Sequence, residues 1–182
     1  MRTPIQENPQ AIDLLLAEMQ KGLTDRLAWL NHAFGKAQYH VNRDGVSTPV
    51  IYLGKNEYSS VMPDGRFGNY SFFDLEPQRT FENWNKNRAG TIKVKFGLVF
   101  WFNLEKIYPT SQSRDTEAVK TQILDVLTRR TVTRHGSYEL EGLNDDAKTI
   151  FQRYFKAGYD EKYLMHPYGA VRIVGTLNYP NT

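Results

Sequence analysis

The residues in this sequence that could do chemistry are histidines, carboxylates and serines, and none stands in a catalytic spacing. The four histidines are far apart and form neither HExxH nor HxH, their positions being His32, His40, His135 and His166. No cysteine is present to serve as a thiolate ligand or nucleophile, and no G-x-S-x-G motif presents a serine. The sequence therefore predicts no catalytic, metal-binding or cofactor-binding residues, and a protein that is not an enzyme.

Two other patterns resemble ligand sites without completing them. Gly54 and Lys55 follow a predicted strand as in a phosphate-binding loop, but the preceding glycine and the following Ser or Thr of that motif are missing. An acidic metal cluster of the kind found in nucleases would combine Asp74, Glu76, Glu105, Asp145 and Asp146. The adjacent aspartates are better explained as a helix cap that also complements the helix dipole. We therefore expect a turn and a helix start at these positions.

Composition and charge favour a soluble protein that meets other proteins. Lys and Arg number 23 against 20 Asp and Glu, which gives a net charge of +3. The N-terminus, MRTPIQENPQ, has no secretory signal pattern, and the apolar runs are far shorter than the ~20 residues of a membrane helix. A cytoplasmic location without a membrane partner is expected. The 11 Tyr, 10 Phe and 3 Trp exceed what a small core would hide, so some should form a surface for a protein partner.

Basic residues cluster in two short segments. These are residues 86–95, KNRAGTIKVK, and residues 129–134, RRTVTR. Either could face phosphate, although solvated faces with several cations are common. The corresponding function would be a nucleic-acid-binding module of a mobile element, with 86–95 on the phosphates and Trp84 as a stacking platform.

The element expected to organise the rest is a long strand at about 91–105, TIKVKFGLVFWFNLE. Its alternation predicts one apolar row under helices, made of Ile92, Val94, Phe96, Leu98, Phe100, Phe102 and Leu104. Gly97 in the opposite row predicts a bend. Four residues of that row, together with Trp84, are the candidate partner or subunit interface: Lys93, Lys95, Val99, Trp101 and Trp84. For Trp101 a second interpretation stands equally, burial beneath another layer of helices.

Other elements follow from periodicity and turn residues. Apolar spacing predicts helices at 9–34, 113–130 and 143–159, the first with Asn8 as cap and divided near Thr24. Strands are expected at 49–53, on both sides of the turn at 63–65, and at 168–179, the last antiparallel to the long strand.

Together these elements predict an α+β fold. It has a mainly antiparallel sheet, one long central strand at about 91–105 and helices packed on one face. Residues 1–182 should form one domain, in which 76–95 is a protruding loop or hairpin arm.

Three segments resemble known sequences: GNYSFFDL (68–75), GLVFWFNLEKIYP (97–109) and YLMHPYGAVRIVGTLNY (163–179). They are similar to a family of small uncharacterised proteins from prophage-like or integrated mobile elements of Bacteroides-type bacteria. The overall pattern of elements also resembles phage tail-terminator and head–tail joining proteins.

This resemblance implies a non-enzymatic structural subunit that assembles into a homo-oligomeric ring, closes a tail tube and contacts other phage structural proteins. The subunit would be located in the host cytoplasm and, after assembly, in the virion. The resemblance carries over no catalytic residues. The chain is longer than many terminators, and its region 35–90 has no counterpart in them.

Overall fold

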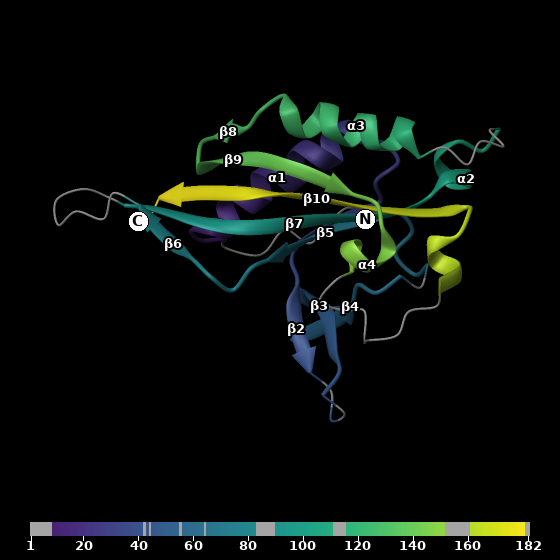
Figure 1. Ribbon diagram of the computed structural model, residues 1–182, viewed down its shortest axis with the longest axis horizontal. Coiled ribbons are helices and arrows are strands. Elements are labelled where there is room, and N and C mark those ends of the chain that lie inside the picture. Colours follow the sequence, from purple (N-terminus) through teal and green to yellow (C-terminus); the bar gives the residue numbers. More distant parts are fainter. Residues whose placement is uncertain are drawn as a thin grey trace.

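The structure is a computed structural model that describes residues 9–41, 43, 45–54, 56–63, 65–82, 90–110, 116–151 and 161–180. Within these ranges the chain forms a large sheet, a small sheet and four α-helices (Figure 1). The architecture is α+β with mainly antiparallel strands, as predicted. Among the described strands, only β1 and β5 pair in parallel.

The large sheet has the strand order β1-β5-β7-β10-β9-β8, and β6 pairs with one end of β7. Its strands are β1 (His32–Lys36), β5 (Tyr70–Leu75), β6 (Thr80–Glu82), β7 (Thr91–Asn103), β8 (Val132–Thr133), β9 (Gly136–Asn144) and β10 (Tyr168–Pro180). The two 13-residue strands β7 and β10 lie antiparallel, from Tyr168 opposite Asn103 to Pro180 opposite Thr91. The predicted long central strand and its pairing with the last strand are confirmed.

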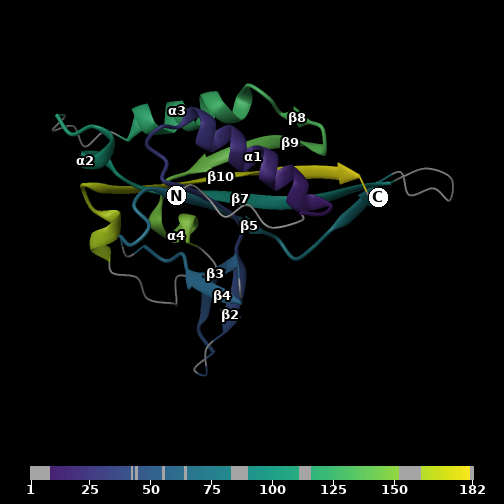
Figure 2. The ribbon, with the colours of Figure 1, turned by 180° about the vertical axis from the view of Figure 1, so that it is seen from behind.

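One face of the large sheet is covered by α1 (Ile12–Arg26) and α3 (Glu117–Thr128), which lie side by side across it (Figure 2). Their apolar stripes pack on the predicted inward row of β7, forming one cluster that includes Leu15, Leu23, Ile123, Phe96 and Phe100. The short helix α2 (Leu104–Ile107) follows β7 directly. The amphipathic spacing of both long helices thus fits burial of one face.

The opposite face carries a second layer. A three-stranded antiparallel sheet projects there, built from β2 (Gln38–Val41), β3 (Ser47–Gly54) and β4 (Glu57–Ser60) (Figure 1). It is joined by α4 (Ala147–Ile150) and the 3₁₀ helix η2 (Glu161–Leu164). These elements enclose a second apolar cluster around Tyr70, Phe72, Val99 and Trp101. Because both faces are covered, every residue of β5 is buried.

The first predicted helix is too long by several residues. Helix α1 ends at Arg26, and the Leu27 N–H still donates to the Leu23 carbonyl at 2.8 Å before the backbone leaves the helical region. Thr24 does not cap a second helix, because its hydroxyl donates to the Gln20 carbonyl at 3.1 Å. The chain continues as β1, whose apolar residues pair beside β5 in the large sheet. Long-range strand pairing outweighs local helical spacing here. Asn8, the expected cap, lies outside the described residues.

Strands β4 and β5 lie on the two sides of the turn at 63–65, as predicted, but they do not pair with each other, because β4 pairs with β3 while β5 pairs with β7 and β1. One further prediction is wrong in its bounds. The helix predicted at 143–159 starts later, since β9 runs to Asn144 and Asp146 caps α4 by accepting from the Thr149 N–H. Residues 152–160 lie outside the described ranges. The hairpin arm is supported in part, because β6 pairs antiparallel with β7.

Candidate functional site

Two of the predicted interface residues lie in the core. Val99 and Trp101 are 0% and 1% exposed, beneath the small sheet and η2. The Trp101 indole N–H donates to the Tyr163 carbonyl at 2.7 Å, and its ring stacks on Tyr168 with centroids 5.1 Å apart. Because they are buried, Val99 and Trp101 are excluded from the candidate interface. Burial beneath a second layer is the interpretation that holds for Trp101, although that layer is mainly a sheet and not helices.

The two predicted interface lysines each lie beside a carboxylate. Lys93 lies 2.9 Å from the Glu82 carboxylate on β6, and Lys95 lies 3.5 Å from Glu141 on β9. A hydrogen bond from the Thr176 hydroxyl, and then the charge of Lys95, lower the pKa of Glu141. Trp84 lies outside the described residues. The lysines therefore face acidic partners, which offsets the positive charge that the segment was expected to offer to phosphate.

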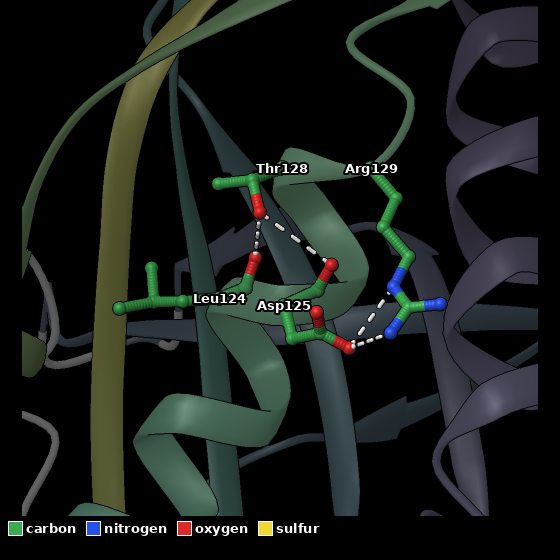
Figure 3. A network of polar contacts seen from close by, with 4 residues as sticks. All are labelled: Leu124, Asp125, Thr128 and Arg129. Atoms are coloured by element: carbon green, nitrogen blue, oxygen red, sulfur yellow. Dashed lines mark hydrogen bonds and ion pairs between the residues drawn. The ribbon is translucent and has the colours of Figure 1, made fainter.

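The second basic cluster, residues 129–134, borders a groove of about 390 Å³ between the C-terminal ends of α1 and α3. Arg129 donates from Nε and Nη2 to the Asp125 carboxylate at 3.0 and 2.6 Å, beside Thr128, whose hydroxyl donates to the Leu124 carbonyl (Figure 3). The groove mixes both signs of charge, its charged residues being Glu18, Lys21, Asp25, Arg26, Arg129 and Arg130. The cations lie near the C-terminal ends of the two helices, where positive charge is favourable. Because acids lie among them, the groove is not a strongly positive surface.

A buried ion pair connects two strands of the large sheet across β7, and a hydrogen bond links it to the small sheet. Arg172 Nη2 on β10 lies 2.8 Å from Asp74 Oδ2 on β5, and the two side chains are 3% and 1% exposed. The Tyr39 hydroxyl of β2 donates to Asp74 Oδ1 at 2.6 Å. The guanidinium occupies the space that a side chain at position 97 would fill, since a Cβ added to Gly97 would lie 2.2 Å from Arg172 Cζ. This network ties the small sheet to the large one and is closed to any ligand.

The exposed face of the small sheet is the most distinctive surface. Tyr52 on β3 lies opposite Tyr58 on β4, with ring centroids 5.2 Å apart and exposed fractions of 44% and 55%. Pro49 and Ile51 are buried on the other side, so alternation and register define the residues that share the outer face. We name them the tyrosine face: Gln38, His40, Thr48, Val50, Tyr52, Tyr58 and Ser60. None of them is Asp, Glu, Lys or Arg.

Sequence reasoning missed both the buried ion pair and the tyrosine face. A signal for the first was present, because Asp74 and Arg172 each stand inside an otherwise apolar strand, where a charge requires an opposite partner. The aromatic excess predicted a contact surface, and the tyrosine face agrees with that composition. Its position could not be predicted, because it depends on which strands pair.

His32, at the start of β1, lies in an aromatic environment that should make stability depend on pH. Its ring stacks on Phe34 at 5.2 Å and meets Phe67 edge-on at 5.9 Å. Burial lowers the pKa of His32 below its usual 6.5. Because the unfolded chain then binds the proton more readily, the free energy of unfolding should fall as the pH drops from about 6.5 through the lowered pKa.

NMR titration of the His32 ring, together with urea unfolding at several pH values, checks this pH dependence. Titration at or above 6.5 would contradict it, and His32→Gln should remove this part of the pH dependence.

Comparison with known proteins assigns no family. No protein-family model matches the chain, and no curated protein has significant sequence similarity to it. In the described part of the chain, no helix is long and apolar enough to cross a membrane, and no three His, Asp or Glu residues are grouped to hold a metal ion. The case for a function therefore rests on the surfaces above and on the resemblance.

Proposed function

We propose that this protein is a non-enzymatic structural subunit of a phage or prophage, a ring-forming tail terminator or head–tail connector. The observation that carries the proposal is the tyrosine face. It is uncharged and aromatic, which is the composition of the buried centre of protein interfaces, where charged residues are depleted and Tyr is enriched. Such a protein would be located in the host cytoplasm before assembly and in the virion afterwards.

The tyrosine face suits contact with further copies of the chain and with other structural proteins. Two copies can approach it without like-charge repulsion, because it carries no formal charge. It also lies on strands β2 and β4, each of which pairs with a described strand on one side only. Unpaired strand edges accept another chain readily unless they are protected. Face and edges together offer a broad surface at the projecting end of the molecule.

Replacing Tyr52 and Tyr58 together by serine should break this assembly. We expect light scattering to report a multiple of the monomer mass for the wild type and a shift towards the monomer for the double variant, because two aromatic anchors are lost. The matched control is Val132→Ser, since Val132 is 68% exposed on the large sheet and should leave the mass unchanged. A folded double variant with the wild-type mass would contradict the role of the tyrosine face, and a wild type that stays monomeric at high concentration would contradict self-assembly.

The alternative, a nucleic-acid-binding module that uses residues 86–95, has less support. Of its described lysines, Lys93 and Lys95 face carboxylates at 2.9 and 3.5 Å. Phosphate contacts would have to displace those acids, which lowers the electrostatic gain from binding.

A further inference from the structure

Strand β4 lies at one edge of the small sheet, which projects from the large one (Figure 1). The N–H of Val61, just after β4, donates to the Pro49 carbonyl of β3 at 3.0 Å. Because hydrogen-bonded and non-hydrogen-bonded pairs alternate along an antiparallel ladder, the next hydrogen-bonded residue of β4 is Ser59. Tyr58 and Ser60 therefore direct their N–H and C=O groups away from β3, towards the edge.

This edge is open to a further strand. In the described part of the chain, β4 pairs with β3 alone, and the outward groups of Tyr58 and Ser60 have no hydrogen-bond partner. Edge strands are often protected by Lys, Pro or a bulge, but β4 contains neither Lys nor Pro. The irregular register of the hairpin lies at Gly54 and Glu57, outside Tyr58–Ser60. The edge from Tyr58 to Ser60 is thus regular and uncharged.

We propose that two copies of the chain pair through β4, antiparallel, about a two-fold axis at Ser59. The N–H and C=O groups of Tyr58 would bond to those of Ser60 in the second copy, and the reverse. This register pairs every outward group from Tyr58 to Ser60. The pairing would join two three-stranded sheets into one continuous sheet, as in other complexes that form by strand addition.

Charge and side chains favour a second copy in this orientation. Glu57 is the only charged residue of β4, and in the proposed register it lies opposite Val61 of the second copy. The two Glu57 side chains are then four residues apart along the strands, about 13 Å, which exceeds the Debye length of about 10 Å in 0.1 M salt. A parallel pair in register would place the two carboxylates side by side.

The same register brings the two tyrosine faces together. Tyr58 of one copy lies diagonal to Tyr58 of the other, with about 7–8 Å between their backbones, a separation that aromatic side chains can span. Each Tyr58 already contacts Tyr52 of its own chain, with ring centroids 5.2 Å apart. The two tyrosine pairs would therefore form one row across the joined sheets.

This inference rests on the proposed self-assembly and specifies how two copies meet. A two-fold contact is closed, because each copy uses the same edge. It would therefore produce dimers, and ring closure would use a further surface, for which the joined tyrosine faces stay available.

A single introduced cysteine tests the two-fold axis, because the chain contains no cysteine and a disulfide could form only between two copies. Ser59→Cys places the two thiols in a non-hydrogen-bonded pair on the axis, where the Cβ atoms lie close together. Glu57→Cys is the matched control on the same strand, because its two thiols would lie about 13 Å apart. With diamide as the oxidant, full-length Ser59→Cys should shift to a covalent dimer on non-reducing electrophoresis, and Glu57→Cys should stay mainly monomeric.

Ser60→Pro tests the edge without changing the tyrosine pair. Proline removes the outward N–H and places its ring at the edge, while no hydrogen bond to β3 is lost. Ser60→Ala is the matched control, because both variants lose the Ser60 hydroxyl that accepts from the Met62 N–H. In a dilution series followed by light scattering, the dimer dissociation constant of Ser60→Pro should exceed that of Ser60→Ala by about tenfold or more, as expected for the loss of two backbone hydrogen bonds.

The cysteine pair decides whether β4 meets β4. Stronger cross-linking of Ser59→Cys than of Glu57→Cys supports the pairing, and it decides the matter alone if Ser60→Pro does not fold. Equal cross-linking of the two would overturn the pairing, because random collision would then explain the disulfide. Weaker assembly of Ser60→Pro without cross-linking at Ser59 would overturn the two-fold axis in favour of contact between β4 and another strand of the next copy.

Two outcomes separate this inference from the proposed function. If the wild type assembles and the Tyr52 and Tyr58 double variant does not, while Ser60→Pro and Ser60→Ala behave alike, the edge pairing is wrong and the role of the tyrosine face stands. If Ser59→Cys cross-links above its control while the wild type stays monomeric by light scattering, the edge pairing is supported as a weak contact and the ring-forming function is contradicted.

Discussion

Replacing Arg172 by methionine should lower the free energy of unfolding by about 3–5 kcal/mol, the range measured when one partner of a buried ion pair is removed. The Asp74 carboxylate would lose its partner at 2.8 Å while remaining buried at 1% exposure. The hydrogen bond from Tyr39 would remain, but a neutral donor does not replace the charge. Equilibrium unfolding in urea, followed by circular dichroism, gives the free energy directly.

A second variant separates the cost of an unpaired charge from the value of the pair. Replacing both partners, Arg172→Met with Asp74→Leu, should recover most of the loss, because no buried charge then remains. The exposed pair of Lys95 and Glu141 provides the control, and Lys95→Met should change the free energy of unfolding by less than about 1 kcal/mol. A double variant as unstable as Arg172→Met alone would contradict this account and would point to packing around the guanidinium over Gly97.

The parts of the fold that the sequence predicted are those with a strong local pattern. The alternating apolar row of β7 is long enough to define a strand, and the final strand repeats the pattern with Val171, Ile173 and Leu177. Both long helices show their buried stripe in the sequence in the same way. Because these patterns record which side of an element is buried, they indicated the fold class without any knowledge of the strand order.

What the sequence did not predict depends on contacts between distant segments. Leu30 and Phe34 continue the helical spacing of α1, yet the helix ends before them, and Phe34 lies in β1, which pairs with β5 about forty residues further along. The hydrogen bonds of the Asn69 side chain to the Trp29 carbonyl and the Asn103 N–H connect distant segments, and each asparagine alone looks like an ordinary turn residue. The sequence leaves an interface and a buried position as equal interpretations of Trp101, because it does not show that the small sheet covers this row of β7.

Replacing Trp101 by alanine should cost about 3–5 kcal/mol of the free energy of unfolding, as for other large aromatic residues removed from a core. The side chain is 1% exposed, packs against Tyr70 and Tyr168 and donates its indole N–H to the Tyr163 carbonyl at 2.7 Å. Trp101→Phe keeps much of the apolar contact but leaves that carbonyl without its donor, so a smaller loss is expected. Urea unfolding measures both.

The same two variants distinguish the core from an interface, because these roles affect different measurements. A core residue changes the free energy of unfolding at any protein concentration, whereas an interface anchor changes the assembled mass. Under conditions in which they are folded, the Trp101 variants should therefore keep the wild-type mass by light scattering, unlike the Tyr52 and Tyr58 double variant. A folded Trp101→Ala protein of normal stability but reduced assembled mass would contradict the core role and show that Trp101 belongs to an interface. It would also mean that the small sheet moves away from β7 on assembly.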